Sequence, residues 1–139
     1  MGQGDDAEIR NLVASLAHEA DSGDVATYVS LFADDAVWEM PGNPLVGLAP
    51  DRRTGRADIG AGVEDRRRAG VQGPGSHTLH VITTMRVEID GDVATAHSYW
   101  QYYADTAADP VLRGVGQYHD TIRRTPEGWK VARRTVVTG

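Results

Sequence analysis

The sequence of 139 residues contains no cysteine. Disulfide bonds, thiolate nucleophiles and cysteine-ligated metals are therefore excluded. The chain also lacks an apolar run long enough to span a bilayer, and no basic segment followed by an apolar one begins at Met1, so we expect a cytoplasmic protein that does not bind membranes. Because the net charge is −6, nucleic acid is not expected as the main partner.

The composition that remains is typical of a folded globular protein. Hydrophobic residues make up 40% and charged residues 24% of the chain, a balance found in folded rather than disordered proteins. This length is enough for one core and too short for two ordinary domains. We therefore expect a single domain over residues 1–139, with its core at about 6–138.

Two helices are predicted at the start of the chain. Apolar residues recur at helical spacing from about Asp6 to Asp21, which predicts one amphipathic helix. Ser22-Gly23 ends this helix, and Asp24 can cap a second one over Val25 to Ala33.

The middle of the chain is less regular. A short strand is predicted over Ala36 to Met40, and residues 42–55 are expected to form a loop. A third helix, rich in arginine, is predicted over Arg56 to Ala69. Its triplet Arg66-Arg67-Arg68 is expected to be a solvated helix face, given the acidic total charge.

The second half of the chain has the pattern of a β-sheet. Four long strands are predicted, over residues 77–89, 93–104, 111–124 and 129–138, with hairpin turns at Asp90-Gly91 and Glu127-Gly128. Helices followed by an antiparallel meander predict an α+β fold. We expect a curved antiparallel sheet wrapped as a cone around the N-terminal helices, an α+β barrel that encloses a pocket.

Asp21 and His80 are the first candidates for chemistry. Asp21 lies at a helix C-terminus, where the helix dipole disfavours negative charge, so its carboxylate needs a cationic partner. His80 lies near the start of the first long strand. A carboxylate that orients an imidazole can help it remove a proton from carbon without a cofactor. A solvated loop acid and a structural histidine remain the alternative interpretations.

Two adjacent arginines on the last strand supply a further candidate. Arg133 and Arg134 cannot both face solvent if one side of the sheet is covered. We expect one of them to point inward, where it needs an anion, either Asp21 or the charge that develops on a substrate. An arginine at the rim that reaches water is the alternative.

Aromatic and amide side chains are candidates for the pocket wall. Tyr99 and Gln101 share one face of their strand, whereas Trp100 lies on the other. Tyr118 has a similar setting, and Tyr28 lies on the buried face of the second helix. We take Tyr28, Tyr99, Gln101 and Tyr118 as substrate-binding candidates, although such residues more often belong to a core.

Neither a metal nor a cofactor is expected. His77 and His80 are three residues apart on a strand and so point to opposite faces. No HExxH or facial-triad spacing is present. Gly114-Val115-Gly116 lies within a β pattern, so it is not a dinucleotide-binding loop.

The order of these segments resembles the SnoaL-like branch of the nuclear-transport-factor-2-like (NTF2-like) superfamily over about residues 6–138. The resemblance is carried by the first helix ending in Asp21, the segment Leu31-Phe32-Ala33-Asp34-Asp35-Ala36-Val37-Trp38, the strand start Thr78-Leu79-His80, and the closing Gly128-Trp129-Lys130-Val131. The sequence looks most like the group that contains scytalone dehydratase, lindane dehydrochlorinase and bile-acid 7α-dehydratase.

This resemblance implies roles for particular residues. Asp21 and His80 match the catalytic dyad of that group, Arg134 matches its inward arginine, and pocket positions fall near Tyr99 and Tyr118. Leu16 stands where relatives can carry a polar helper, so the acid that assists the leaving group is not identified. The resemblance also implies a homodimer or homotrimer.

The function we expect is a cofactor-independent lyase or cyclase, either a dehydratase or an aldol-type ring-closing enzyme. Its substrate would be a small, largely apolar, ring-bearing or polyketide-like molecule. An isomerase or an epoxide hydrolase in the same pocket is one alternative. A non-catalytic ligand-binding or assembly module is another, since small subunits of ring-hydroxylating oxygenases share this fold.

Overall fold

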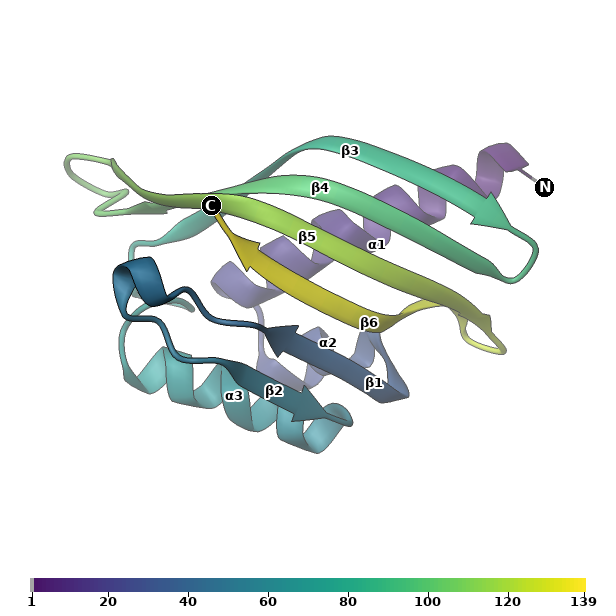
Figure 1. The fold of residues 1–139 in the computed structure, drawn as a ribbon, viewed down its shortest axis with the longest axis horizontal. Coiled ribbons are helices and arrows are strands. Elements are labelled where there is room, and N and C mark those ends of the chain that lie inside the picture. Colours follow the sequence, from purple (N-terminus) through teal and green to yellow (C-terminus); the bar gives the residue numbers. More distant parts are fainter. Residues whose placement is uncertain (1) are drawn as a thin grey trace.

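The structure is a computed structural model that describes residues 2–139 (Figure 1). Within these residues the helices are α1 (Gly2–Ser22), α2 (Val25–Ser30), a short 3-10 helix η1 (Pro44–Val46) and α3 (Arg56–Arg68). The strands are β1 (Phe32–Met40), β2 (Asp51–Thr54), β3 (Leu79–Asp90), β4 (Val93–Ala104), β5 (Val111–Thr125) and β6 (Gly128–Thr138).

The strands form one mixed sheet in the order β2-β1-β6-β5-β4-β3. β1 runs parallel to β6, and all other neighbours are antiparallel. α1 lies across the sheet against β3 and β6, whereas α2 and α3 pack beside β1 and β2 (Figure 1). The predicted α+β class is confirmed, and the helices lie on one face of a strongly twisted sheet.

The core lies between α1 and the sheet. α1 buries one apolar stripe, as its helical spacing predicts, and α2 and α3 add apolar side chains at the other end of the sheet. The most deeply buried residues are Ile9, Val13, Leu16, Phe32, Ile59, Val63, Ile122 and Val131. None of the helices that the structure describes has both the length and the apolarity needed to cross a membrane.

The prediction was wrong about where the second helix ends and the first strand begins, although the end of that strand at Met40 is confirmed. α2 ends at Ser30, and β1 begins at Phe32 rather than at Ala36. Phe32 is fully buried and pairs with Val131 of β6. Strand pairing at this residue therefore overrides the helical spacing of the local sequence.

The expected loop at 42–55 also contains a strand. β2 pairs antiparallel with β1 at the edge of the sheet, with Trp38 opposite Arg53. Its four residues are polar, so no apolar alternation marks it in the sequence, as is common for short edge strands. The sheet consequently has six strands, one more than the predicted short strand and four long strands, and it includes the parallel pair of β1 and β6.

A β-bulge in β3 corrects the predicted faces of that strand. Strict alternation places Met85 and Val87 on the face opposite His80 and Ile82. Thr84 has a φ of 54°, and the pairing with β4 shifts between Thr83 and Arg86. Because the extra residue reverses the alternation, Ile82, Met85 and Val87 all pack against the core.

Candidate active site

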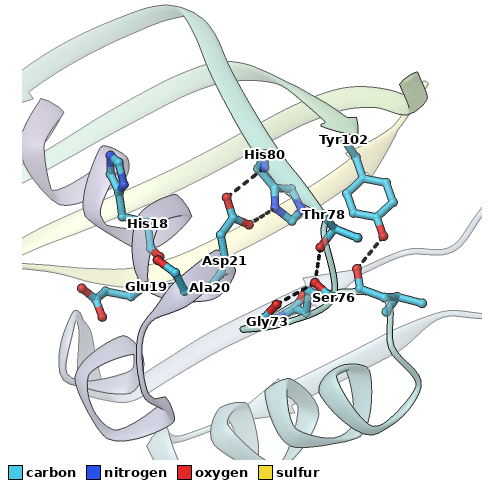
Figure 2. Close-up of polar contacts among 12 residues, drawn as sticks. His18, Glu19, Ala20, Asp21, Gly73, Ser76, Thr78, His80 and Tyr102 are labelled. Carbon is cyan, nitrogen blue, oxygen red and sulfur yellow. Dashed lines mark hydrogen bonds and ion pairs between the residues drawn. The ribbon is translucent and has the colours of Figure 1, made fainter. Parts of the chain in front are cut away.

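Asp21 and His80 are in direct contact. Asp21 lies in the last turn of α1, and His80 is the second residue of β3. The Nδ1 atom of His80 lies 2.8 Å from Oδ1 of Asp21, and the backbone N–H of His80 donates to Oδ2 at 3.0 Å (Figure 2). The carboxylate therefore fixes both the ring and the backbone of the histidine.

The end of α1 is built to tolerate the Asp21 carboxylate. Carbonyl groups at a helix C-terminus carry partial negative charge and need donors. Arg67 of α3 supplies one, because its Nη2 atom donates to the carbonyls of Glu19 and Ala20 at 3.0 and 3.2 Å. This contact brings a cation to the helix end and ties α3 to α1 beside the dyad.

The segment before β3 is held by its own hydrogen bonds. The Ser76 hydroxyl donates to the carbonyl of Gly73 and lies 2.7 Å from the Thr78 hydroxyl, while the Tyr102 hydroxyl donates to the carbonyl of Val71 (Figure 2). The Tyr102 ring centroid is 5.2 Å from that of His80. These contacts fix the approach of the chain to His80.

The geometry determines which nitrogen of His80 is available. When Nδ1 carries the proton that Asp21 accepts, Nε2 has a free lone pair. Within residues 2–139, Nε2 has no protein hydrogen-bond partner. Both side chains of the dyad are 16% exposed, so the pair is sheltered and still reachable.

His80 lines a large cavity between the helices and the sheet. The cavity has a volume of about 780 Å³, and Asp21 lies behind His80 rather than on the wall. Its apolar wall includes Leu16, Trp38, Met40 and Trp100, and its polar wall includes Tyr28, His80, Tyr118 and Arg134. This size and mixture of groups are typical of small-molecule sites.

Arg134 lies inward, and its anion is Asp120. Nε and Nη2 of Arg134 donate to the two carboxylate oxygens of Asp120 at 2.8 and 2.9 Å. Burial alone would lower the pKa of Arg134, but the Asp120 charge outweighs it and raises that pKa, so the guanidinium stays charged. Its carbon lies 3.8 Å from the centroid of the Tyr118 ring. Asp21, one of the two expected anions, is bound by His80 instead.

Comparison with known protein families identifies the family of this chain. A family model described as a SnoaL-like domain matches residues 4–135. The chain belongs to the SnoaL-like domain family. This family includes enzymes. Comparison with curated proteins gives no match.

Solved structures share the fold of this SnoaL-like domain. An NTF2-like protein with a cystatin-like fold from Novosphingobium aromaticivorans has a TM-score of 0.82 and 28% identity, over 98% of this chain and 82% of that one. A proposed aromatic ring hydroxylase from the same species has a TM-score of 0.77 and 27% identity, over 97% and 89%. ActVI-ORFA from Streptomyces coelicolor, at 24% identity, has a TM-score of 0.73 over 95% of both chains and shows the fold alone. The NTF2-like fold is confirmed.

Two predicted pocket residues lie elsewhere in this SnoaL-like domain. Tyr99 is 50% exposed, and neither it nor Gln101 lines the cavity. Trp100 and Tyr102, on the other face of β4, line it instead. The small buried residues Ala94, Ala96 and Ser98 precede Trp100 with period 2 and mark the inner face, a signal that the hydroxyl-based choice of Tyr99 overlooked.

The other two substrate-binding candidates, Tyr28 and Tyr118, do line the cavity. Tyr28 and Tyr118 are 4% and 9% exposed. Burial raises the pKa of both phenols, so they stay protonated at neutral pH and can act as hydrogen-bond donors.

The expectation of a solvated Arg66-Arg67-Arg68 face was wrong for two of the three arginines. Arg67 binds the end of α1, and Arg66 lines the cavity. The helical spacing could have predicted the inward position of Arg66, because this residue follows the buried Ile59 and Val63 at i+7 and i+3. Among residues 2–139, no cluster of three or more His, Cys, Asp or Glu side chains is arranged as a metal site.

Proposed function

We propose that the protein is a cofactor-independent lyase or cyclase in which His80 is the general base. The observation that carries the proposal is the double contact of Asp21 with the ring and backbone of His80. This contact leaves the lone pair of Nε2 free on His80, and His80 lines the cavity. The resemblance to the scytalone dehydratase group supports the same roles.

The reaction begins with transfer of a proton from an activated carbon to Nε2 of His80. The C–H electron pair moves toward a neighbouring carbonyl, and an enolate forms. Asp21 stabilises the imidazolium that results, as carboxylates do in other histidine-based systems. Arg134 retains Nη1, which has no protein partner within residues 2–139, to bind the enolate oxygen together with the Tyr118 hydroxyl.

Two outcomes follow from the same enolate. In a dehydration, the enolate expels a β-hydroxyl group while the His80 imidazolium returns its proton to the departing oxygen, and water leaves. In a ring closure, the enolate carbon attacks a second carbonyl of the same substrate, and the new alkoxide takes the proton. The aromatic and aliphatic wall favours a ring-bearing substrate.

Epoxide opening by an Asp-Arg-Asp arrangement has less support. Asp120 uses both carboxylate oxygens to bind Arg134 and is 1% exposed, so it does not present a free base to the cavity. Product mass separates three cases: loss of water for a dehydratase, no change for an isomerase or for an aldol-type ring closure, and gain of water for an epoxide hydrolase.

The homodimer or homotrimer and the cytoplasmic location stay predictions.

The base can be tested without knowing the natural substrate. 2-Tetralone is a neutral bicyclic ketone with activated C1 protons, and their exchange in D₂O is measured by proton NMR. We expect wild-type protein to accelerate the exchange and His80→Ala to lose about 10²–10⁴-fold of that acceleration. His97→Ala, which removes an exposed histidine of β4, is the matched control. Wild-type exchange by a folded His80→Ala variant contradicts the proposal.

A further inference from the structure

A second polar cluster lies in the same cavity, and it is formed by Arg66, Gln72 and Trp38. Nε of Arg66 donates to the Oε1 atom of Gln72 at 3.1 Å. The guanidinium carbon lies 4.6 Å from the centroid of the Trp38 ring. Gln72 and Trp38 are 8% and 7% exposed, so these two contacts hold the guanidinium in a fixed, sheltered position on the cavity wall.

Arg66 differs from the other arginines of the cavity in its charge balance. The cavity is lined by Arg53, Arg66, Arg113 and Arg134. Three of these have a carboxylate oxygen within 4.0 Å, supplied by Asp51, Asp105 and Asp120 among others. Within residues 2–139, no carboxylate lies that close to Arg66. It therefore brings to the cavity a positive charge that no carboxylate contacts directly, and Asp51, which acts on it from a longer distance, is already paired with Arg53.

Such a charge is costly unless something balances it. Burial lowers the pKa of Arg66, in keeping with a cation that lacks a partner. The Gln72 amide and the Trp38 ring offset part of this cost, and the last turn of α3 adds partial negative charge. None of these groups carries a full negative charge.

The free atoms of Arg66 have the geometry that suits a carboxylate. Because Nε is bound by Gln72, the two terminal nitrogens Nη1 and Nη2 remain. A guanidinium presents these atoms as a planar fork that matches the two oxygens of a carboxylate. Gly62, one turn earlier in α3, leaves them room, since a Cβ there would lie 3.3 Å from Nη1 of Arg66.

The Tyr28 phenol lines the same cavity as Arg66. Tyr28 is 4% exposed and lines the cavity, and its hydroxyl donates to no protein group among the hydrogen bonds of residues 2–139. It is close enough to Arg66 and Arg134 for both charges to act on its ionisation. A phenol hydroxyl on the cavity wall that makes no protein hydrogen bond can donate to a ligand oxygen.

We infer that Arg66, with Tyr28, binds a carboxylate group of a ligand whose apolar ring system fills the rest of the cavity. The substrate of the proposed reaction would then be an aromatic or alicyclic carboxylate rather than a neutral molecule. As a statement about the substrate this inference rests on the proposed function, whereas the binding of the carboxylate needs only Arg66 and the cavity.

The test compares a carboxylate ligand with its neutral amide, which has the same ring system. 2-Naphthoate and 2-naphthamide share one ring system, and their binding is measured by isothermal titration calorimetry at neutral pH. We expect wild-type protein to bind naphthoate about tenfold or more tightly than the amide, as a charge-assisted contact allows. In Arg66→Gln the two ligands should bind within about twofold of each other, with the affinity for the amide unchanged. Arg66→Lys should keep part of the preference.

Two control variants make the result specific. Arg113→Gln removes another cavity arginine, one already paired with Asp105, and should keep the preference for naphthoate. His80→Gln should abolish proton exchange with 2-tetralone and also keep the preference, so the two proposals can fail separately. The inference is overturned if wild-type protein binds neither ligand or shows no preference, if Arg66→Gln retains the preference, or if His80→Gln or Arg113→Gln loses it.

Discussion

Two residues of the cavity wall, His80 and Arg134, are each bound by a carboxylate at the same shortest distance but in different surroundings. Asp21 lies 2.8 Å from Nδ1 of His80, and Asp120 lies 2.8 Å from Nε of Arg134. The first pair joins a helix end to the edge strand β3, and both side chains are 16% exposed. The second joins the neighbouring strands β5 and β6 inside the sheet, with side chains 4% and 0% exposed.

The difference lies in what the partner of each carboxylate can do with a proton. A neutral imidazole can accept a proton and return it, whereas a guanidinium stays protonated. The pair that reaches the cavity through His80 is therefore suited to proton transfer. The pair inside the sheet is suited to hold a fixed positive charge beside it. A base and a fixed cation are the two components that enolate chemistry requires.

The largest expected effect is a loss of proton-exchange activity when the partly exposed Asp21–His80 pair is changed. Asp21→Asn keeps the size of the side chain but lets its amide donate to Nδ1 of His80, so the proton moves to Nε2 and the base is lost. We expect the exchange of 2-tetralone protons to fall by about 10²–10⁴-fold, measured by proton NMR in D₂O. Glu19→Gln, two residues earlier in the same helix, is the control. Unchanged exchange in Asp21→Asn would remove the carboxylate from the mechanism.

Disruption of the buried Asp120–Arg134 pair should lower the free energy of unfolding. Asp120→Asn leaves the Arg134 guanidinium buried without its anion, and breaking a buried pair in this way costs about 3–5 kcal/mol. Urea unfolding followed by tryptophan fluorescence measures the loss. Asp35→Asn removes a carboxylate of similar contact distance whose partner, Arg123, is exposed, and it should change the free energy of unfolding little. Equal losses in both variants would contradict the distinction between the two pairs.

Much of this arrangement could be predicted from the sequence because the residues concerned lie at the ends of regular elements. Asp21 closes a helix with a clear apolar stripe, and His80 begins a long β pattern. The order of elements and the resemblance to SnoaL-like proteins then pair them across 59 residues. Arg134 was similarly limited to two positions by strand alternation, and the resemblance chose between them.

The remaining errors arise where non-local contacts decide the structure. The bulge at Thr84 and the pairing of Phe32 with Val131 depend on strands distant in the sequence. Asp120 was not predicted as the partner of Arg134, because that contact depends on the register between β5 and β6. Tyr99 was placed in the cavity for its hydroxyl group, whereas the packing of small residues along β4 decides which face turns inward.

The smallest expected effect is a change in thermal stability when the exposed Arg123–Asp35 pair is removed. Its dependence on pH and salt distinguishes this pair from the buried one. The Arg123 guanidinium donates to Asp35 and lowers the pKa of that carboxyl. A lowered folded-state pKa gives stability that is present above the unfolded value of about 3.8 and is lost as pH falls below it. Arg123→Gln should therefore lower the thermal midpoint slightly at pH 7. The difference from wild type should shrink toward zero as pH falls through the lowered folded-state pKa of Asp35, and also in about 1 M salt, which screens exposed charges. The loss in Asp120→Asn should persist in the same salt, because a buried pair is screened much less. If salt removed both differences equally, the Asp120–Arg134 pair would behave as a surface pair, and its role as a fixed cation in the cavity would fail.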